Sequence, residues 1–275
     1  MTHQLKPTCP QAAAPTASEA KASLRQHVLS RRDALDPEAR TERSRKLCHK
    51  LANVLKNHFA TSDHPDHAKS TPTVALYHAM KSEVDLTALD QALREKAWTV
   101  CYPIMLKQGE IIPCEHAVSI QGNISPDQVR TDATQTQTMP GSGRTPSHTV
   151  DTFNSMAFFI PPKVCANRET SSSDGAIPEA TNDILAHPLR RHTIFDLEEA
   201  GFTFVAPSTI DALIVPLVAF DDRNVRLGYG GGNYDNYLPL LREGCLIIGV
   251  AFAEQQVEVV PTEPHDLPLP SIMVG

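Results

Sequence analysis

Long apolar runs are absent from this sequence of 275 residues. The longest is the nine-residue stretch Ala212–Phe220, which Pro216 interrupts. A helix that crosses a bilayer needs about 20 apolar residues, so we expect no transmembrane segment. The N-terminus also has no apolar stretch behind basic residues, and we therefore expect no secretory signal.

Closely spaced cysteine pairs are absent too. The chain has six cysteines and no CxxC pair. Several lie in apolar stretches, which favours reduced thiols and a cytoplasmic location over a disulfide framework. A net charge of −7 gives no support to a nucleic-acid-binding surface. The balance reverses locally in residues 21–50, which hold nine Lys and Arg against four Asp and Glu. That region is either a solvated basic helix or the wall of an anion site.

The first 105 residues predict two helices and then a βαβ unit. Residues 1–17 have no pattern and are expected to form a disordered tail. Helices are expected at residues 19–35 and 36–59, the second with a buried stripe. Residues 74–78 and 98–102 read as strands of a parallel pair, joined by a helix that Asp85 caps and ended by Pro103. The predicted stripe consists of Leu47, Leu51, Val54 and Leu55.

Residues 119–188 are rich in Ser, Thr, Asp, Asn and Pro. A segment this long without a structural pattern is unusual inside a compact domain, so we expect a largely disordered insertion, with Ala157–Pro161 docking on the core. Buried strands then follow at residues 202–205, 211–215 and 245–252. Residues 18–275 are therefore predicted to form one α/β domain. We expect a single Rossmann-like, three-layer architecture with a mostly parallel sheet and helices on both faces.

The most informative motif is Arg226-Leu-Gly-Tyr-Gly-Gly-Gly-Asn-Tyr-Asp235, directly after a predicted buried strand. Glycines let backbone N–H groups approach an anion, and a following helix N-terminus favours negative charge. Asp235 can hold a Mg²⁺ that bridges phosphate oxygens. The motif has no GK[ST] and is not a P-loop, and it also lacks the third glycine of the dinucleotide fingerprint. A glycine-rich turn without a ligand is the alternative interpretation.

Four segments in order resemble the 5-formyltetrahydrofolate cyclo-ligase (5,10-methenyltetrahydrofolate synthetase) family. They are Lys21-Ala-Ser-Leu-Arg25 ahead of Arg31-Arg32, ALYHAMKSEVDLTALDQAL, IVPLVAFDDRNVRLGYGGGNYDNYL and IIGVAFAEQQVEVVPTEPHDLPL. The similarity covers about residues 19–58, 73–105 and 190–272. The order of four motifs is more specific than any one of them. Compact members of the family lack the segment at 119–188.

The resemblance implies an ATP- and Mg²⁺-dependent conversion of 5-formyltetrahydrofolate to 5,10-methenyltetrahydrofolate, with release of ADP and phosphate. It also implies a monomer that acts on these two small molecules, without nucleic-acid or membrane partners. Arg226, Tyr234 and Lys21 are then the expected catalytic residues, and Asp235 and Asp266 the expected metal ligands. The nucleotide is expected to contact Lys21, Arg25, Arg226, Leu227, Gly228, Tyr229, Gly230, Gly231, Gly232, Asn233 and Tyr234. The folate is expected to contact His78, Glu83, Tyr229, Gly231 and Asn233.

The chain departs from the family pattern after the glycines. Asn233 and Asn236 stand where the family usually has Tyr and Arg, and Pro239 predicts a short or kinked helix. Glu198 is a possible match to a family carboxylate. A degenerate paralogue that binds folate or nucleotide without turnover therefore stays open, as does another enzyme on a related α/β scaffold. His64 and His67 offer too few ligands for a closed metal site.

Overall fold

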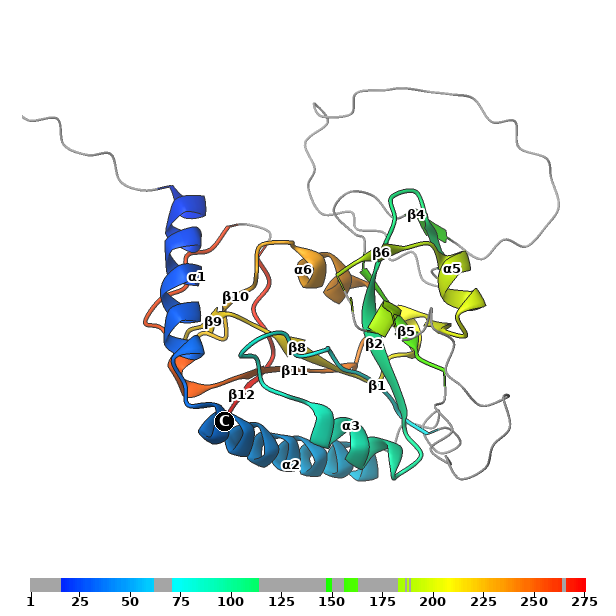
Figure 1. Cartoon of the computed structure of the whole chain (residues 1–275), viewed down its shortest axis with the longest axis horizontal. Helices are drawn as coiled ribbons and strands as arrows, with labels where there is room; N and C mark the ends of the chain where they lie inside the picture. Colours follow the sequence, from blue (N-terminus) through cyan, green and yellow to red (C-terminus); the bar gives the residue numbers. More distant parts are fainter. Residues whose placement is uncertain are drawn as a thin grey trace, which may run out of the picture.

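The structure is a computed structural model of the chain, which describes residues 16–61, 71–113, 147–149, 156–162, 183–185, 187, 189–263 and 266–275. Its centre is a mixed sheet in the order β12-β11-β8-β1-β2-β5-β7, with β6 paired to β2 (Figure 1). The strands are β1 (Thr73–Ala75), β2 (Thr99–Leu106), β5 (Met156–Ile160), β6 (Arg191–His192), β7 (Thr203–Val205), β8 (Ala212–Pro216), β11 (Leu246–Ala251) and β12 (Ile272–Val274). All pairings are parallel except those of β5 with β2 and β7. The predicted α/β class with a mostly parallel sheet is confirmed.

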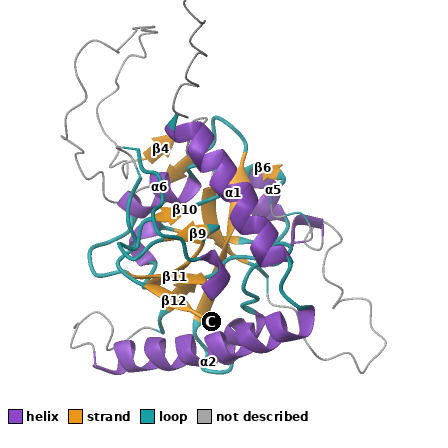
Figure 2. Cartoon of the chain, turned by 90° about the vertical axis from the view of Figure 1, so that its left-hand side faces the viewer, coloured by secondary structure: helices purple, strands orange, loops and turns teal. Residues whose placement is uncertain are grey.

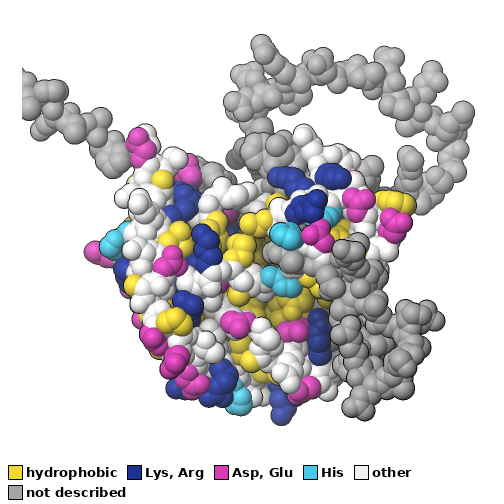
Figure 3. Space-filling view, viewed as in Figure 1, with side chains coloured by type: hydrophobic (Ala, Val, Ile, Leu, Met, Phe, Trp, Pro, Cys, Tyr) yellow, Lys and Arg dark blue, Asp and Glu magenta, His cyan; other side chains and the backbone are white. Residues whose placement is uncertain are grey.

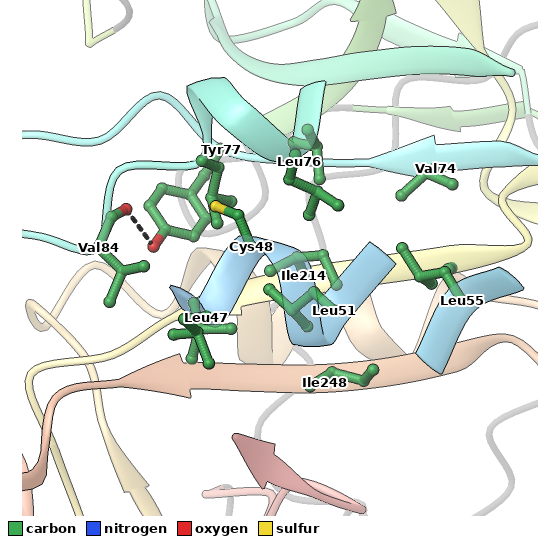
Figure 4. Close-up of a cluster of buried hydrophobic side chains, with 14 of the residues drawn as sticks. Leu47, Cys48, Leu51, Leu55, Val74, Leu76, Tyr77, Val84, Ile214 and Ile248 are labelled. Carbon is green, nitrogen blue, oxygen red and sulfur yellow. Dashed lines mark hydrogen bonds between the residues drawn. The ribbon is translucent and has the colours of Figure 1, made fainter. Parts of the chain in front are cut away.

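Helices α2 (Pro37–Thr61) and α3 (Thr87–Arg94) cover one face of this sheet. Alternate residues of a strand point to opposite faces, so Val74 packs towards these helices and Ala75 towards the other side. Figure 4 shows Leu51 of α2 against Ile214 of β8 in this layer. The apolar stripe of α2 and the alternation of the strands therefore produce the first half of the core.

The opposite face is covered by α6 (Asn233–Tyr237) and the 3₁₀ turn η3 (Leu238–Leu240). Tyr237 is 1% exposed and packs on Phe158 of β5, with ring centroids 4.9 Å apart. A third cluster joins β2 and β5 to α5 (Ile194–Glu199). Helices therefore lie on both faces, as predicted.

Helix α1 (Ala17–Asp33) stands apart from these layers, beside the hairpin of β9 (Ala219–Phe220) and β10 (Arg226–Leu227) (Figures 1 and 2). Its Val28 is fully buried with Val218 and Leu227. Thr16 caps its first turn in a reciprocal pair of hydrogen bonds with Glu19, so the helix begins two residues before the predicted start. The packing of Val28 on Val218 and Leu227 holds the basic side chains of α1 next to the glycine loop that follows β10.

The remaining described elements are short. The hairpin of β3 (Ile111–Pro113) and β4 (Ser147–Thr149) is separate from the main sheet. The other 3₁₀ turns are η2 (Pro207–Thr209) and η4 (Ala253–Gln255). The N-cap of α3 is Leu86, not Asp85 as predicted, but Asp85, one residue earlier, still accepts the Thr87 N–H of the first turn at 2.9 Å. No helix in the described ranges is both long and apolar enough to span a bilayer.

Strand β2 does not end at Pro103, contrary to the prediction. It continues to Leu106, and Pro103 pairs with Phe158 of β5. The register with β1 ends at Cys101, so on that side no strand requires the N–H that proline lacks. The predicted stopping point was therefore wrong because Pro103 lies between the residues of β2 that pair with β1 and those that pair with β6.

The predicted docking of Ala157–Pro161 on the core is confirmed, but its role as a strand inside the sheet was not predicted. Met156–Ile160 form β5, with Phe158 and Phe159 fully buried between β2 and β7. Val54 of α2 was also predicted in the buried stripe, but it is 38% exposed. Cys48, which was not predicted there, is 2% exposed and belongs to the stripe. His64 and His67 lie outside the described residues.

Candidate functional site

A cavity of about 480 Å³ lies at the carboxyl ends of β1 and β8. Figure 3 shows hydrophobic side chains inside a hollow near the middle of this face. The cavity is lined by every residue that the sequence predicted for the site: Lys21, Arg25, His78, Glu83, Arg226, Leu227, Gly228, Tyr229, Gly230, Gly231, Gly232, Asn233, Tyr234, Asp235 and Asp266. Residues from four separate segments of the sequence therefore meet at one place.

The position of this cavity follows from the order of the strands. From β1 the chain crosses to β2 on one side, whereas β8 leads to β11 on the other. The connections diverge between β1 and β8, and such a switch point leaves a crevice at the carboxyl ends of the strands. Tyr77 and His78 follow β1, and Pro216 ends β8; all three line the cavity.

The glycine loop, residues 228–232, forms one wall. Gly230 and Gly232 have φ values of 100° and 65°, a region that side chains rarely adopt. A Cβ added at Gly230 would lie 3.4 Å from the guanidinium of Arg25, whose Nε donates to the Gly228 carbonyl at 2.8 Å. Arg25 therefore packs directly on the loop. Glycine at Gly230 suits both the backbone conformation and this close approach.

Helix α6 after the loop is only five residues long and passes into a 3₁₀ turn that contains Pro239. The predicted short helix is therefore confirmed. Its macrodipole is correspondingly small, because few peptide dipoles are aligned. The backbone amides of the loop are a better source of positive potential than the helix that follows them.

Two buried cations of the cavity are paired with the two predicted metal ligands. Arg226 Nη2 donates to Asp235 Oδ1 at 2.7 Å, and its Nη1 donates to the Leu267 carbonyl at 2.6 Å. Lys21 Nζ lies 2.6 Å from Asp266 Oδ2 and 2.7 Å from Glu263 Oε2. The side chains of Arg226 and Lys21 are 4% and 7% exposed, so both charges depend on these partners.

The balance of effects on Lys21 favours its charged form. Burial alone lowers the pKa of Lys21, but hydrogen bonds and charge from Asp266 and Glu263 outweigh it and leave the pKa raised. The ammonium group is therefore present at neutral pH. Lys21 and Arg226 can neutralise an anion, provided that their carboxylates find a cation in exchange.

Glu83 forms part of the opposite wall. Its side chain is largely buried, and Oε2 accepts the Met80 N–H at 2.8 Å. Among the described residues, Oε1 has no hydrogen-bond partner within ordinary distance. Burial raises the pKa of Glu83, while the Met80 amide, Tyr229 and Arg32 act in the opposite direction. A buried carboxylate oxygen without a donor is suited to receive an N–H from a ligand.

Aromatic side chains complete the cavity wall. His78 stacks on Tyr102 with ring centroids 4.1 Å apart and an interplanar angle of 13°. Burial lowers the pKa of His78, so this ring is neutral at pH 7. Burial also raises the pKa of Tyr229 to about 12, with a further contribution from Glu83. These neutral rings offer flat surfaces for a planar ligand.

The described residues contain no group of three or more His, Cys, Asp or Glu that could hold a metal ion. This does not conflict with magnesium, which is usually bound by one or two carboxylates together with phosphate oxygens and water. Asp235 and Asp266 both line the cavity, and each lies against a cation that a phosphate can neutralise. The donor set therefore fits Mg²⁺ with a phosphate ligand.

Sequence reasoning missed Glu263 and Arg32. Glu263 lies three residues before the predicted Asp266 and shares its contact with Lys21. Arg32 continues the face of α1 that carries Lys21 and Arg25, since positions 21, 25 and 32 follow helical spacing. That spacing was available from the sequence. By contrast, Glu198 lies exposed on α5 and does not line the cavity.

The fold and the cavity define an α/β protein with a cavity at the carboxyl ends of the parallel strands of a mixed sheet. Residues 193–275 match the model of the 5-formyltetrahydrofolate cyclo-ligase family. Over 67 residues the chain is 49% identical to the 5-formyltetrahydrofolate cyclo-ligase of Haemophilus influenzae, covering 24% of this chain and 36% of the relative. The Mycolicibacterium smegmatis cyclo-ligase is 30% identical over 111 residues, covering 35% of this chain and 57% of the relative.

The solved structure of a 5,10-methenyltetrahydrofolate synthetase from Mycoplasma pneumoniae has a TM-score of 0.54 and 19% identity, covering 92% of this chain and 96% of the other. This likeness shows the shared fold. Over its C-terminal segment the chain is therefore similar to the 5-formyltetrahydrofolate cyclo-ligase family. The aligned segments span about a third of the length of the first curated relatives, 36% and 37%.

Proposed function

We propose that the protein catalyses the ATP-dependent cyclisation of 5-formyltetrahydrofolate to 5,10-methenyltetrahydrofolate. The observation that carries this proposal is the convergence of the predicted nucleotide and folate residues on one cavity at the switch point of the sheet. The family match of residues 193–275 supports it independently. A monomer acting on these two substrates remains the prediction.

The reaction must turn a formyl oxygen into a leaving group. Transfer of the γ-phosphoryl group forms a bond from that oxygen to phosphorus, breaks the bond to the β-phosphate oxygen and releases ADP. N10 then attacks the formyl carbon and loses its proton, the carbon–oxygen bond breaks, and phosphate leaves. Phosphoryl transfer requires mainly alignment and charge stabilisation from the protein, so no covalent nucleophile is needed.

Lys21, Arg226 and the amides of residues 228–232 are proposed to bind the triphosphate. Guanidinium and ammonium groups stabilise the charge that develops on transferring phosphoryl oxygens. Arg25 would support the loop through its bond to the Gly228 carbonyl and direct its remaining donors to the phosphates. Asp235 and Asp266 are proposed to hold Mg²⁺, which supplies charge neutralisation when bound.

The folate is proposed to lie between His78, Glu83, Tyr229 and Tyr234. Glu83 Oε1 would accept a hydrogen bond from the N–H groups of the pterin, because its other oxygen is already occupied by the Met80 amide. The neutral His78 ring and Tyr229 would provide apolar contact. Asn233 would contribute an amide where the family usually has a tyrosine ring.

The test is the near-ultraviolet absorbance of the methenyl product in a mixture of protein, 5-formyltetrahydrofolate, Mg²⁺ and ATP. Absorbance should grow only with ATP, and Asp235→Asn should reduce the rate roughly a hundredfold or more. Glu199→Gln, an exposed carboxylate on α5, is the matched control and should leave the rate unchanged. A flat trace from folded wild-type protein, with ligand binding intact, would instead identify a non-catalytic folate or nucleotide binder.

A further inference from the structure

Arg32 of α1 is a buried charged side chain that is not part of the cavity wall. It is 1% exposed, and it does not line the cavity. A guanidinium taken out of water is costly unless it is well hydrogen-bonded. Its burial therefore requires an explanation in the residues around it.

The guanidinium joins three segments that are distant in the sequence. Nε donates to Ser82 Oγ at 2.9 Å, and Nη2 donates to Tyr229 Oη at 2.9 Å. Ser82 in turn donates to Asp33, the residue after Arg32. Helix α1, the loop that carries Glu83 and the glycine loop that carries Tyr229 are thus connected through one side chain.

Arg32 also acts on the charge of Glu83. Burial raises the pKa of Glu83, and the positive charge of Arg32 is one of the effects that lower it. Among the described residues, neither Arg32 Nη1 nor Glu83 Oε1 has a hydrogen-bond partner. Glu83 therefore receives stabilising charge from Arg32 without losing its free oxygen to a direct contact.

We propose that Arg32 is a positioning residue for substrate binding, which fixes Tyr229 and places a positive charge near Glu83 while one oxygen of Glu83 stays free. Arg32 does so without touching the substrate. This inference rests on the proposed function for the identity of the ligand. Its two parts are separable, because the contact with Tyr229 needs the fork of the guanidinium, whereas the effect on Glu83 needs only the charge.

The experiment measures the dissociation constant of 5-formyltetrahydrofolate by calorimetry between pH 5 and 9, together with kcat and KM. Arg32→Met removes both parts and Arg32→Lys keeps the charge, whereas Tyr229→Phe removes the hydroxyl that accepts from Arg32 and that also lowers the pKa of Glu83. Arg31→Met is the matched control, since Arg31 is the exposed neighbour and its interactions are with the Gln256 carbonyl at 3.5 Å and with the charge of Glu254, away from Ser82 and Tyr229. Thermal unfolding identifies any variant that does not fold.

Arg32→Met should weaken binding roughly tenfold to a hundredfold, the value of one charged hydrogen bond, with a matching rise in KM and little change in kcat. Its affinity should also begin to fall at a higher pH on acidification, because the pKa of Glu83 rises further. Arg32→Lys should restore the wild-type pH profile but not the full affinity. In the double variant with Arg32→Met and Tyr229→Phe, the dissociation constant should rise by a smaller factor than the product of the factors in the two single variants.

Unchanged affinity and pH profile in Arg32→Met, or an equal loss in Arg31→Met, would overturn the proposal. A loss in kcat alone would also contradict it, because a residue that positions groups for substrate binding should raise KM when it is replaced. If Arg32→Met does not fold, the pH profile of Arg32→Lys and the affinity of Tyr229→Phe decide instead. If the wild-type protein binds the folate but does not turn it over, only the proposed reaction fails, and the binding data still decide the role of Arg32.

Discussion

The pair of Arg226 and Asp235 should respond unequally to loss of either partner. The Arg226 side chain is 4% exposed and Asp235 is 26% exposed, with 2.7 Å between Nη2 and Oδ1. Asp235→Asn leaves a buried guanidinium with the neutral Leu267 carbonyl as its remaining partner in the described structure. Arg226→Met leaves a carboxylate that water can reach. We therefore expect Asp235→Asn to be the more destabilising change.

The magnitude follows from the burial of the partner that is left. Removing one member of a fully buried pair costs about 3–5 kcal/mol. Access of water at the Asp235 side reduces this, and we expect about 2–3 kcal/mol for Asp235→Asn and about 1 kcal/mol for Arg226→Met. The double variant should lose less than the sum, because no uncompensated charge remains.

The assay is urea unfolding of the two single variants and the double variant, analysed as a double-mutant cycle. The surface pair Arg45 and Glu42, 65% and 45% exposed, is the matched control, and its cycle should show little coupling. Equal losses in Asp235→Asn and Arg226→Met, with no more coupling than the surface pair, would refute the reasoning from unequal burial.

Three further changes test the core and the cavity wall. Leu51→Ala should lower the free energy of unfolding by about 2–5 kcal/mol, whereas Val54→Ala on the same helix should cost under about 1 kcal/mol, as measured in urea. Gly249→Ala should cost about 1–3 kcal/mol and lower Tm, because its Cβ would lie 2.6 Å from Leu269 Cδ1; an unchanged Tm would contradict that clash. The pKa of Glu83 is higher in the folded protein than in the unfolded chain. The stability that protonated Glu83 contributes is therefore complete at a pH below its pKa in the unfolded chain, and it is lost as the pH rises through its pKa in the folded protein. Glu83→Gln should therefore be more stable than the wild type at pH 8 and lose this advantage towards pH 4, and an advantage that grows on acidification would show the opposite shift.

The local patterns of the sequence predicted most of the fold. The stripe of α2 and the alternation of β8 report burial directly, because each period matches its element. Strand β5 was predicted to dock on the core from within an insertion, and not to be a strand of the sheet, because its five apolar residues lie among polar ones. Its place between β2 and β7 depends on pairing with strands more than 40 residues away along the chain, which no local pattern contains.

The membership of the site was predictable, but its internal contacts were not. The glycine motif and the spacing of Lys21 and Arg25 identified residues that line one cavity. The pairing of Arg226 with Asp235 and of Lys21 with Asp266 was not foreseen, since each was assigned to a separate ligand atom. Charges of opposite sign that converge on one site neutralise each other. Such a pairing can be recognised only when the distances between the side chains are known.

The pairing of β1 with β8 also has a consequence for folding. Thr73 and Asp211 are 138 residues apart in the sequence, yet they are joined across this pair by two hydrogen bonds. Closing a loop costs entropy that grows with the logarithm of its length, and each doubling adds only about 0.6 kcal/mol. Adding or removing about 30 residues between β3 and β5 would thus change the closure free energy by a few tenths of a kcal/mol. The length of this segment can therefore vary at little thermodynamic cost, while the pairing of β1 with β8 stays a non-local contact of the kind that slows folding.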